Sequence, residues 1–129
     1  MMFEQLDVFR MSSAMAIHAG QRQAIASQNV ANSDTPGYVA KDIAAFETLY
    51  QSSRDGTVQR ATRTGHLNGS VDGMQVTEPF EVRDEASPNG NAVSLETEML
   101  RSLDAKRQHD RSLAIYKSAL SVLRSTIGK

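Results

Sequence analysis

Two long stretches of the chain repeat their apolar positions at alternating spacings of three and four residues. The first covers residues 3–32, which contain no proline and are rich in Ala, Gln, Met and Arg, all good helix formers. The second covers residues 95–127. This spacing places apolar side chains along one side of a helix. The pattern therefore predicts a mainly α protein in which two long helices pack as a coiled coil.

The apolar seam of the first helix starts with bulky side chains and becomes small toward its end. Small residues let a neighbouring helix backbone come close. The later half of this helix is therefore expected to pack tightly against another helix. The seam consists of Phe3, Leu6, Arg10, Ser13, Ile17, Gly20, Ala24, Ser27 and Ala31, with Met11, Met15, Ile25 and Val30 beside it.

The seam of the second helix is apolar at seven of its ten positions. Ser94 is expected to cap this helix. Its polar centre has two readings, because such groups either fix register and partner choice or are solvated where two helices diverge. A helix roughly 50 Å long cannot bury its stripe alone, so it needs the first helix and other chains. The seam consists of Leu95, Met99, Ser102, Lys106, His109, Leu113, Tyr116, Leu120, Leu123 and Ile127.

The first helix is expected to end in residues 29–38. Pro36 cannot continue a helix and pushes the residue before it out of the α region, so the break falls near residues 33–35. Asn29 and Asn32 lie on the last helical turn, where both can bond free backbone groups beyond it. Gly37 tolerates left-handed backbone angles. A sharp turn is expected here.

Between the turn and the second helix the chain is less regular. Asp42 is expected to cap a brief helix from Ile43. An alternating face around Phe80 and Val82 suggests a short edge strand, with residues 57–63 as its partner. The middle is either such a flap or a segment that orders against a partner. The domains are predicted as 1–35 (axial helix), 36–50 (turn and short helical segment), 51–92 (glycine-rich linker) and 93–129 (coiled-coil helix).

Composition argues against most kinds of chemistry. A net charge of −1 gives no support for a nucleic-acid partner, and 5% aromatic residues without Trp leave little to wall a substrate cavity. The chain has no Cys and only scattered histidines, so no metal site, cofactor or catalytic residue is expected. No run of about 18 apolar residues predicts a membrane span, and the first residues lack the features of a secretory leader.

Residues 25–38 carry a motif that resembles the signature of a known family. The run Ile-Ala-Ser-Gln-Asn-Val-Ala-Asn-Ser-Asp-Thr-Pro-Gly-Tyr resembles the signature of the bacterial flagellar axial proteins, which form the rod, hook and hook-filament junction. Within the basal-body rod protein family, the short length and the Lys41-Asp42-Ile43 that follows are most similar to the proximal rod subunit. Residues 90–99 resemble the start of that subunit's last helix. The other short rod protein is the alternative within the family.

The resemblance implies a structural subunit and not an enzyme. Such proteins leave the cell through the flagellar type III export apparatus without a cleaved leader and polymerise helically into the periplasmic rod, which transmits torque from motor to hook. The implied partners are further copies of the chain, other rod proteins, the adaptor protein at the inner-membrane ring and the export gate. Residues 46–50 resemble the element that export substrates present to this gate, which gives Phe46 and Tyr50 a candidate role.

The implied assembly assigns roles to the seams and to the turn. Asn29 and Asn32 are expected to lock the turn, and Tyr38 to anchor the departing chain. The rival hypothesis is a small cytosolic coiled-coil adaptor or export chaperone, which would form a stable discrete dimer. The residues of the motif are Asn29, Asn32, Thr35, Pro36, Gly37 and Tyr38, and those of the assembly interface are Ile17, Gly20, Ala24, Ala31, Leu95, Met99, Leu113, Tyr116, Leu120, Leu123 and Ile127.

Overall fold

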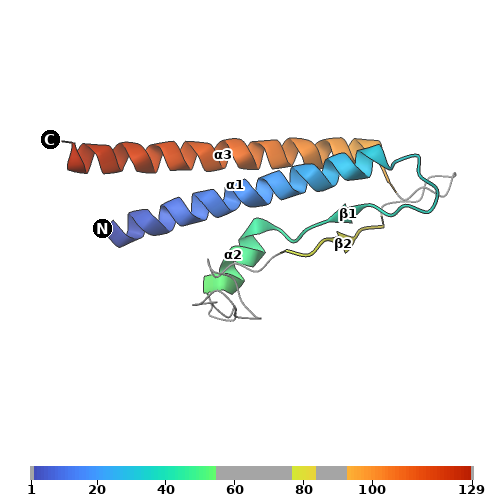
Figure 1. The fold of residues 1–129 in the computed structure, drawn as a ribbon, viewed down its shortest axis with the longest axis horizontal. Helices are drawn as coiled ribbons and strands as arrows, with labels where there is room; N and C mark the ends of the chain where they lie inside the picture. The colour runs from blue at the N-terminus through green and yellow to red at the C-terminus, as the bar shows by residue number, and fades with distance from the viewer. Residues whose placement is uncertain (1, 55–76, 84–92, 129) are drawn as a thin grey trace, which may run out of the picture. The chain divides into compact units, whose positions relative to one another are not determined.

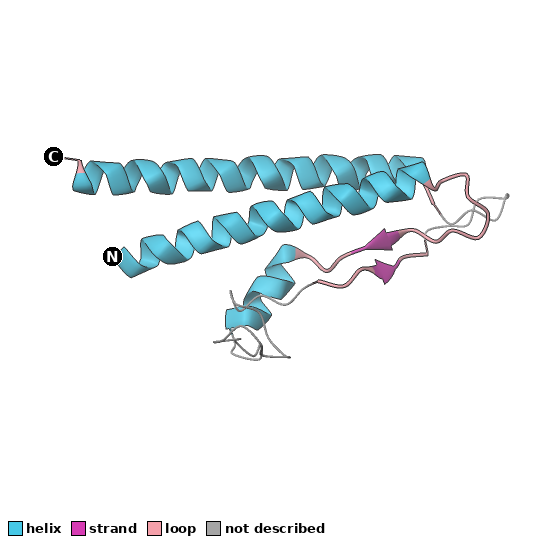
Figure 2. Cartoon of the chain, viewed as in Figure 1, coloured by secondary structure: helices cyan, strands magenta, loops and turns pink. Residues whose placement is uncertain are grey.

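A computed structural model describes residues 2–54, 77–83 and 93–128. Its elements are α1 (Met2–Ala31), β1 (Lys41–Asp42), α2 (Phe46–Arg54), β2 (Phe80–Glu81) and α3 (Leu95–Ile127), and Figure 2 shows how helix dominates the described chain. The predicted fold class is confirmed. The chain divides into two compact units, residues 1–41 with 81–129 and residues 42–80.

The first unit is built on α1 and α3, which lie side by side and run antiparallel (Figure 1). The bounds of α3 are those predicted, and α1 ends one residue earlier than expected. Ser94 caps α3 as predicted, because its hydroxyl accepts a hydrogen bond from the Thr97 N–H at 3.4 Å. At the other end, the Gly128 N–H donates to the Arg124 carbonyl.

Five side-chain contacts fix the register of the two helices. Phe9 and Tyr116 meet edge to face with ring centroids 5.2 Å apart. The Gln108 side-chain amide donates to the Met15 carbonyl at 3.1 Å and contacts the His18 ring at 2.9 Å, and Gln23 donates to the Ser102 hydroxyl at 2.6 Å. Asn29 meets Glu98 near the end of α1. The contacting residue numbers therefore rise along α1 as they fall along α3, which is an antiparallel alignment with one register.

The face that α1 and α3 turn to each other is lined by small and polar residues spaced seven apart, which we call the inner stripe. Each of its side chains is at most 3% exposed. The register places Ser12 at the level of Ser112, and Ala19 at the level of Ala105. Such small residues let two helix backbones come close. The inner stripe consists of Ser12, Ala19 and Ala26 on α1 and Glu98, Ala105 and Ser112 on α3.

The sequence-based choice of the face that joins the two helices was wrong for α1 and only partly right for α3. The described residues of the predicted α1 seam are all exposed, and most of the predicted α3 seam is exposed too. Ser102 and Tyr116 of the α3 seam nevertheless contact α1. Side-chain size did not identify the buried face, because Met15 is buried while Gly20 is exposed.

The two-stranded ladder differs from the predicted one. β2 pairs with β1, and beside this pair the Val82 N–H donates to the Ala40 carbonyl at 2.8 Å. The proposed partner strand, residues 57–63, lies outside the described residues. The short helix begins at Phe46 and not at Ile43, because Asp42 lies in β1, where its carboxylate accepts a bond from the adjacent Ile43 N–H.

Candidate functional site

Many bulky apolar side chains of α1 and α3 are exposed, although some of them, such as Tyr116, also contact the other helix. Met99 and Ile127 are both 69% exposed, and Ile17 is 62% exposed. Exposed apolar residues that repeat along a helix are typical of a surface that another chain covers. We call these residues the outer stripes. They consist of Leu6, Ile17 and Val30 on α1 and Leu95, Met99, Leu100, Leu103, Leu113, Tyr116, Val122 and Ile127 on α3.

The residues predicted for the assembly interface belong to or lie beside these stripes. Gly20, Ala24 and Ala31 are exposed on α1, whereas Leu120 and Leu123 are half-buried on α3. In the polar centre of the α3 seam, Lys106 and His109 are exposed. Within the subunit these two positions fit the solvated reading.

An apolar groove runs along the first unit between α1 and α3. Its volume is about 870 Å³, and it carries far more apolar than polar surface. Gly20 lies on its α1 side, and Leu100 and Leu103 lie on its α3 side.

None of the described helices is both long and apolar enough to cross a membrane.

The turn after α1 is held by its own polar groups. The Asn32 side chain donates to the Gln28 carbonyl at 2.8 Å and accepts from the Thr35 hydroxyl at 3.2 Å. Gly37 has a φ of +77°, the left-handed region that glycine enters without a steric penalty. The Tyr38 N–H then donates to the Thr35 carbonyl at 3.2 Å. The expected turn is thus present, with the chain reversing over residues 32–38.

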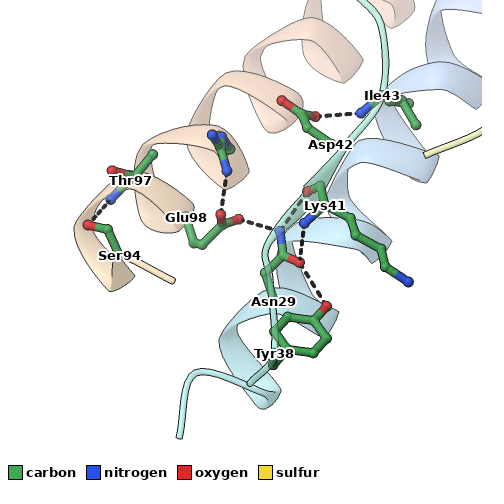
Figure 3. A network of polar contacts seen from close by, with 9 residues as sticks. Asn29, Tyr38, Lys41, Asp42, Ile43, Ser94, Thr97 and Glu98 are labelled. Carbon is green, nitrogen blue, oxygen red and sulfur yellow. Dashed lines mark hydrogen bonds and ion pairs between the residues drawn. The ribbon is translucent and has the colours of Figure 1, made fainter. Parts of the chain in front are cut away.

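Asn29 is the centre of a buried polar cluster (Figure 3). Its side-chain carbonyl accepts from the Tyr38 hydroxyl at 2.9 Å and from the Lys41 N–H at 3.0 Å. Its NH₂ group donates to the Lys41 carbonyl at 2.8 Å and to the Glu98 carboxylate at 3.0 Å. The amide therefore uses both acceptor positions and both donors. The cluster joins α1, the chain after the turn, and α3.

Glu98 is the member of this cluster that the sequence did not reveal. It is an acidic residue in the first turn of α3, yet its side chain is fully buried. Its second carboxylate oxygen pairs with Arg101 at 2.5 Å. One signal was available, because Glu98 lies seven residues before Ala105 on the same face as the small residues.

Burial raises the pKa of the Tyr38 phenol above its usual value of 10.0, and the negative charge of Glu98 acts in the same direction. The neutral hydroxyl is the form that donates to Asn29. Among the residues described, no three His, Asp or Glu side chains converge as a metal site would require. The arrangement is suited to holding backbone in place and to packing against other chains.

Comparison with known proteins identifies the class. A family model described as "Flagella basal body rod protein" matches residues 12–38, which run from the first residue of the inner stripe to Tyr38. The chain is 29% identical to the flagellar basal body rod protein FlgB of Agrobacterium fabrum, over 96% of this chain and 95% of that protein. It is 32% identical to FlgB of Escherichia coli K12, over 81% and 84%. FlgB of Cereibacter sphaeroides is 31% identical, over 82% of each.

The fold and these relatives define a structural protein of the flagellar basal body and not an enzyme. The chain belongs to the FlgB family of basal-body rod proteins. Of the two short rod proteins that the motif allowed, the relatives select the proximal rod subunit.

Proposed function

We propose that this chain builds the proximal rod by packing its outer stripes against further copies of itself and against other rod proteins. The observation that supports this most directly is the difference in burial between the two faces of its helices. The inner stripe is fully buried within the subunit, while side chains such as Met99, Leu103 and Ile127 are left in water. Moving such a side chain completely from water to an apolar contact is worth about 1.5–3 kcal/mol, and assembly can gain the share that corresponds to the part still exposed.

Helical polymerisation requires contacts that continue from one copy to the next. Identical chains related by a screw operation make heterologous contacts, which do not close into a ring unless the rotation permits it. On α1, the exposed Gly20, Ala24 and Ala31 leave room for a neighbouring helix to approach its backbone. Ile17, on the same side, supplies apolar area. A mixture of small and bulky outward residues suits lateral helix packing.

The same proposal extends to location, export and partners. The subunit would pass through the flagellar type III export apparatus without a cleaved leader, assemble in the periplasm, join the adaptor protein at the inner-membrane ring, and transmit torque to the hook. Phe46 and Tyr50 are the candidate element for the export gate. Their rings stack with centroids 5.7 Å apart, and Phe46 is 8% exposed. The gate would therefore have to meet this element before α2 is packed.

The test places a bulky side chain on the outer face of α1. Ala24→Leu and Ala31→Leu should leave the free subunit folded, since both positions are exposed, but should prevent rod assembly and abolish swimming. Helical content by circular dichroism, rods in purified basal bodies, and motility in soft agar are the three measurements.

Ala26→Leu is the matched control, because Ala26 is 3% exposed and belongs to the inner stripe. It should destabilise the free subunit itself by roughly 1–3 kcal/mol through overpacking. Normal rods and motility in Ala24→Leu and Ala31→Leu cells would refute close packing on this face. A stable discrete dimer of the free wild-type chain would favour the adaptor or chaperone hypothesis instead.

A further inference from the structure

We infer that Asn29, Tyr38, Lys41 and Glu98 form a register latch, which makes the fold of the turn after α1 depend on the docking of α3. This inference concerns one subunit and stands apart from the proposed role in the rod. It rests on the contacts of a single buried amide, all of which lie within the first unit.

One side of the latch holds the backbone at Lys41. The Asn29 side chain accepts from the Lys41 N–H at 3.0 Å and donates to the Lys41 carbonyl at 2.8 Å, as a neighbouring strand would. Lys41 is also the first residue of β1. The side chain of Asn29 therefore places the chain where it leaves the turn.

The other side of the latch satisfies the second N–H of the amide. The Lys41 N–H and carbonyl already set which way the amide faces, because a half-turn would point the NH₂ group at a donor and the amide oxygen at an acceptor. One N–H of the amide then remains, and the Glu98 carboxylate accepts it at 3.0 Å. Arg101 in turn holds Glu98. Asn29 and Glu98 are both fully buried, so water has no access to replace either partner.

The inner stripe alone specifies register poorly. Its members are spaced seven apart and, Glu98 excepted, are all Ala or Ser, so sliding α3 by seven residues would still set small residues against small ones. Such a slide would bring Ala105 to the level of Asn29, and an alanine side chain has no acceptor for the amide. A buried polar pair that only one alignment satisfies is a known means of fixing register. Glu98 thus favours one alignment of α3 with α1. Because Asn29 also bonds Tyr38 and Lys41, the same alignment stabilises the turn.

The test is amide hydrogen exchange, read by NMR, on the full-length chain. Glu98→Ala should speed exchange of the Lys41 N–H about tenfold or more, although Glu98 itself does not bond Lys41, because it leaves a buried Asn29 N–H without its acceptor and so destabilises the docked amide. The Ala105 and Ser112 amides within α3 should keep their protection. Glu96→Ala is the matched control, since it removes an exposed glutamate from the same helical turn and should leave Lys41 unchanged.

Unchanged exchange at Lys41 in Glu98→Ala would overturn the latch, and so would a wild-type chain in which Lys41 is unprotected. If the Ala105 and Ser112 amides also lose their protection in Glu98→Ala, the helix pair has separated. In that case a second variant, Tyr38→Phe, tests the latch. This variant removes one hydroxyl from the opposite side of Asn29. Coupling is reciprocal, so it should speed exchange of the Glu98 N–H, which bonds the Ser94 carbonyl. No change there would overturn the proposal.

Discussion

Backbone conformation at two glycines illustrates how single residues shape this chain in opposite ways. Gly37 has a φ of +77° and lies in the turn, whereas Gly20 lies inside α1. A Cβ atom added at either position would meet nothing within 4 Å. Any effect of adding a methyl group must therefore come from backbone preference and not from a steric clash in the subunit.

Gly37→Ala should lower the free energy of unfolding by about 1–2 kcal/mol, because an L-residue is strained in the left-handed region. Gly20→Ala should raise it by roughly 0.5–1 kcal/mol, because alanine loses less entropy in a helix. Urea unfolding followed by circular dichroism measures both. If both substitutions changed the free energy of unfolding by the same amount and in the same direction, the turn geometry at Gly37 would not be formed in solution.

At the scale of elements, the sequence predicted where helices begin and end better than which faces meet. Local signals locate the ends approximately: Ser94 caps α3, and α1 ends at Ala31, shortly before the break predicted near residues 33–35. Which faces meet depends on what the rest of the molecule buries, and the described residues of the predicted α1 seam are exposed in the subunit. Asn29 was recognised from the motif, but its partner Glu98 is 69 residues away, and no local pattern pairs them.

The inner stripe determines which substitutions the helix pair tolerates. Ala105→Leu should destabilise the subunit by about 1–3 kcal/mol, because Ala105 is 1% exposed and a larger side chain at a buried position forces its neighbours to shift. Leu103→Ala, two residues away, should change stability by at most about 0.5 kcal/mol, because Leu103 is 44% exposed. Urea unfolding curves test the pair. The reverse order of effects would mean that the face of α3 that carries Leu103, and not the inner stripe, joins the helices.

For the molecule as a whole, the consequence is a subunit with two kinds of helix surface. Small and polar residues satisfy each other inside it, and the latch fixes their alignment. The outer stripes remain for neighbouring chains, as expected of a member of the FlgB family. Mutations on the inner stripe should therefore act through stability, and mutations on the outer stripes through assembly.

The most direct test of this account is the accessibility of the outer stripes before and after assembly. The chain has no native cysteine, so Leu103→Cys and Leu113→Cys each provide a unique thiol for maleimide labelling. Leu103 and Leu113 are 44% and 41% exposed in the subunit. Both thiols should react quickly in the free subunit and be protected in purified basal bodies. Equal labelling in the assembled rod, or protection already in the free monomer, would contradict the account.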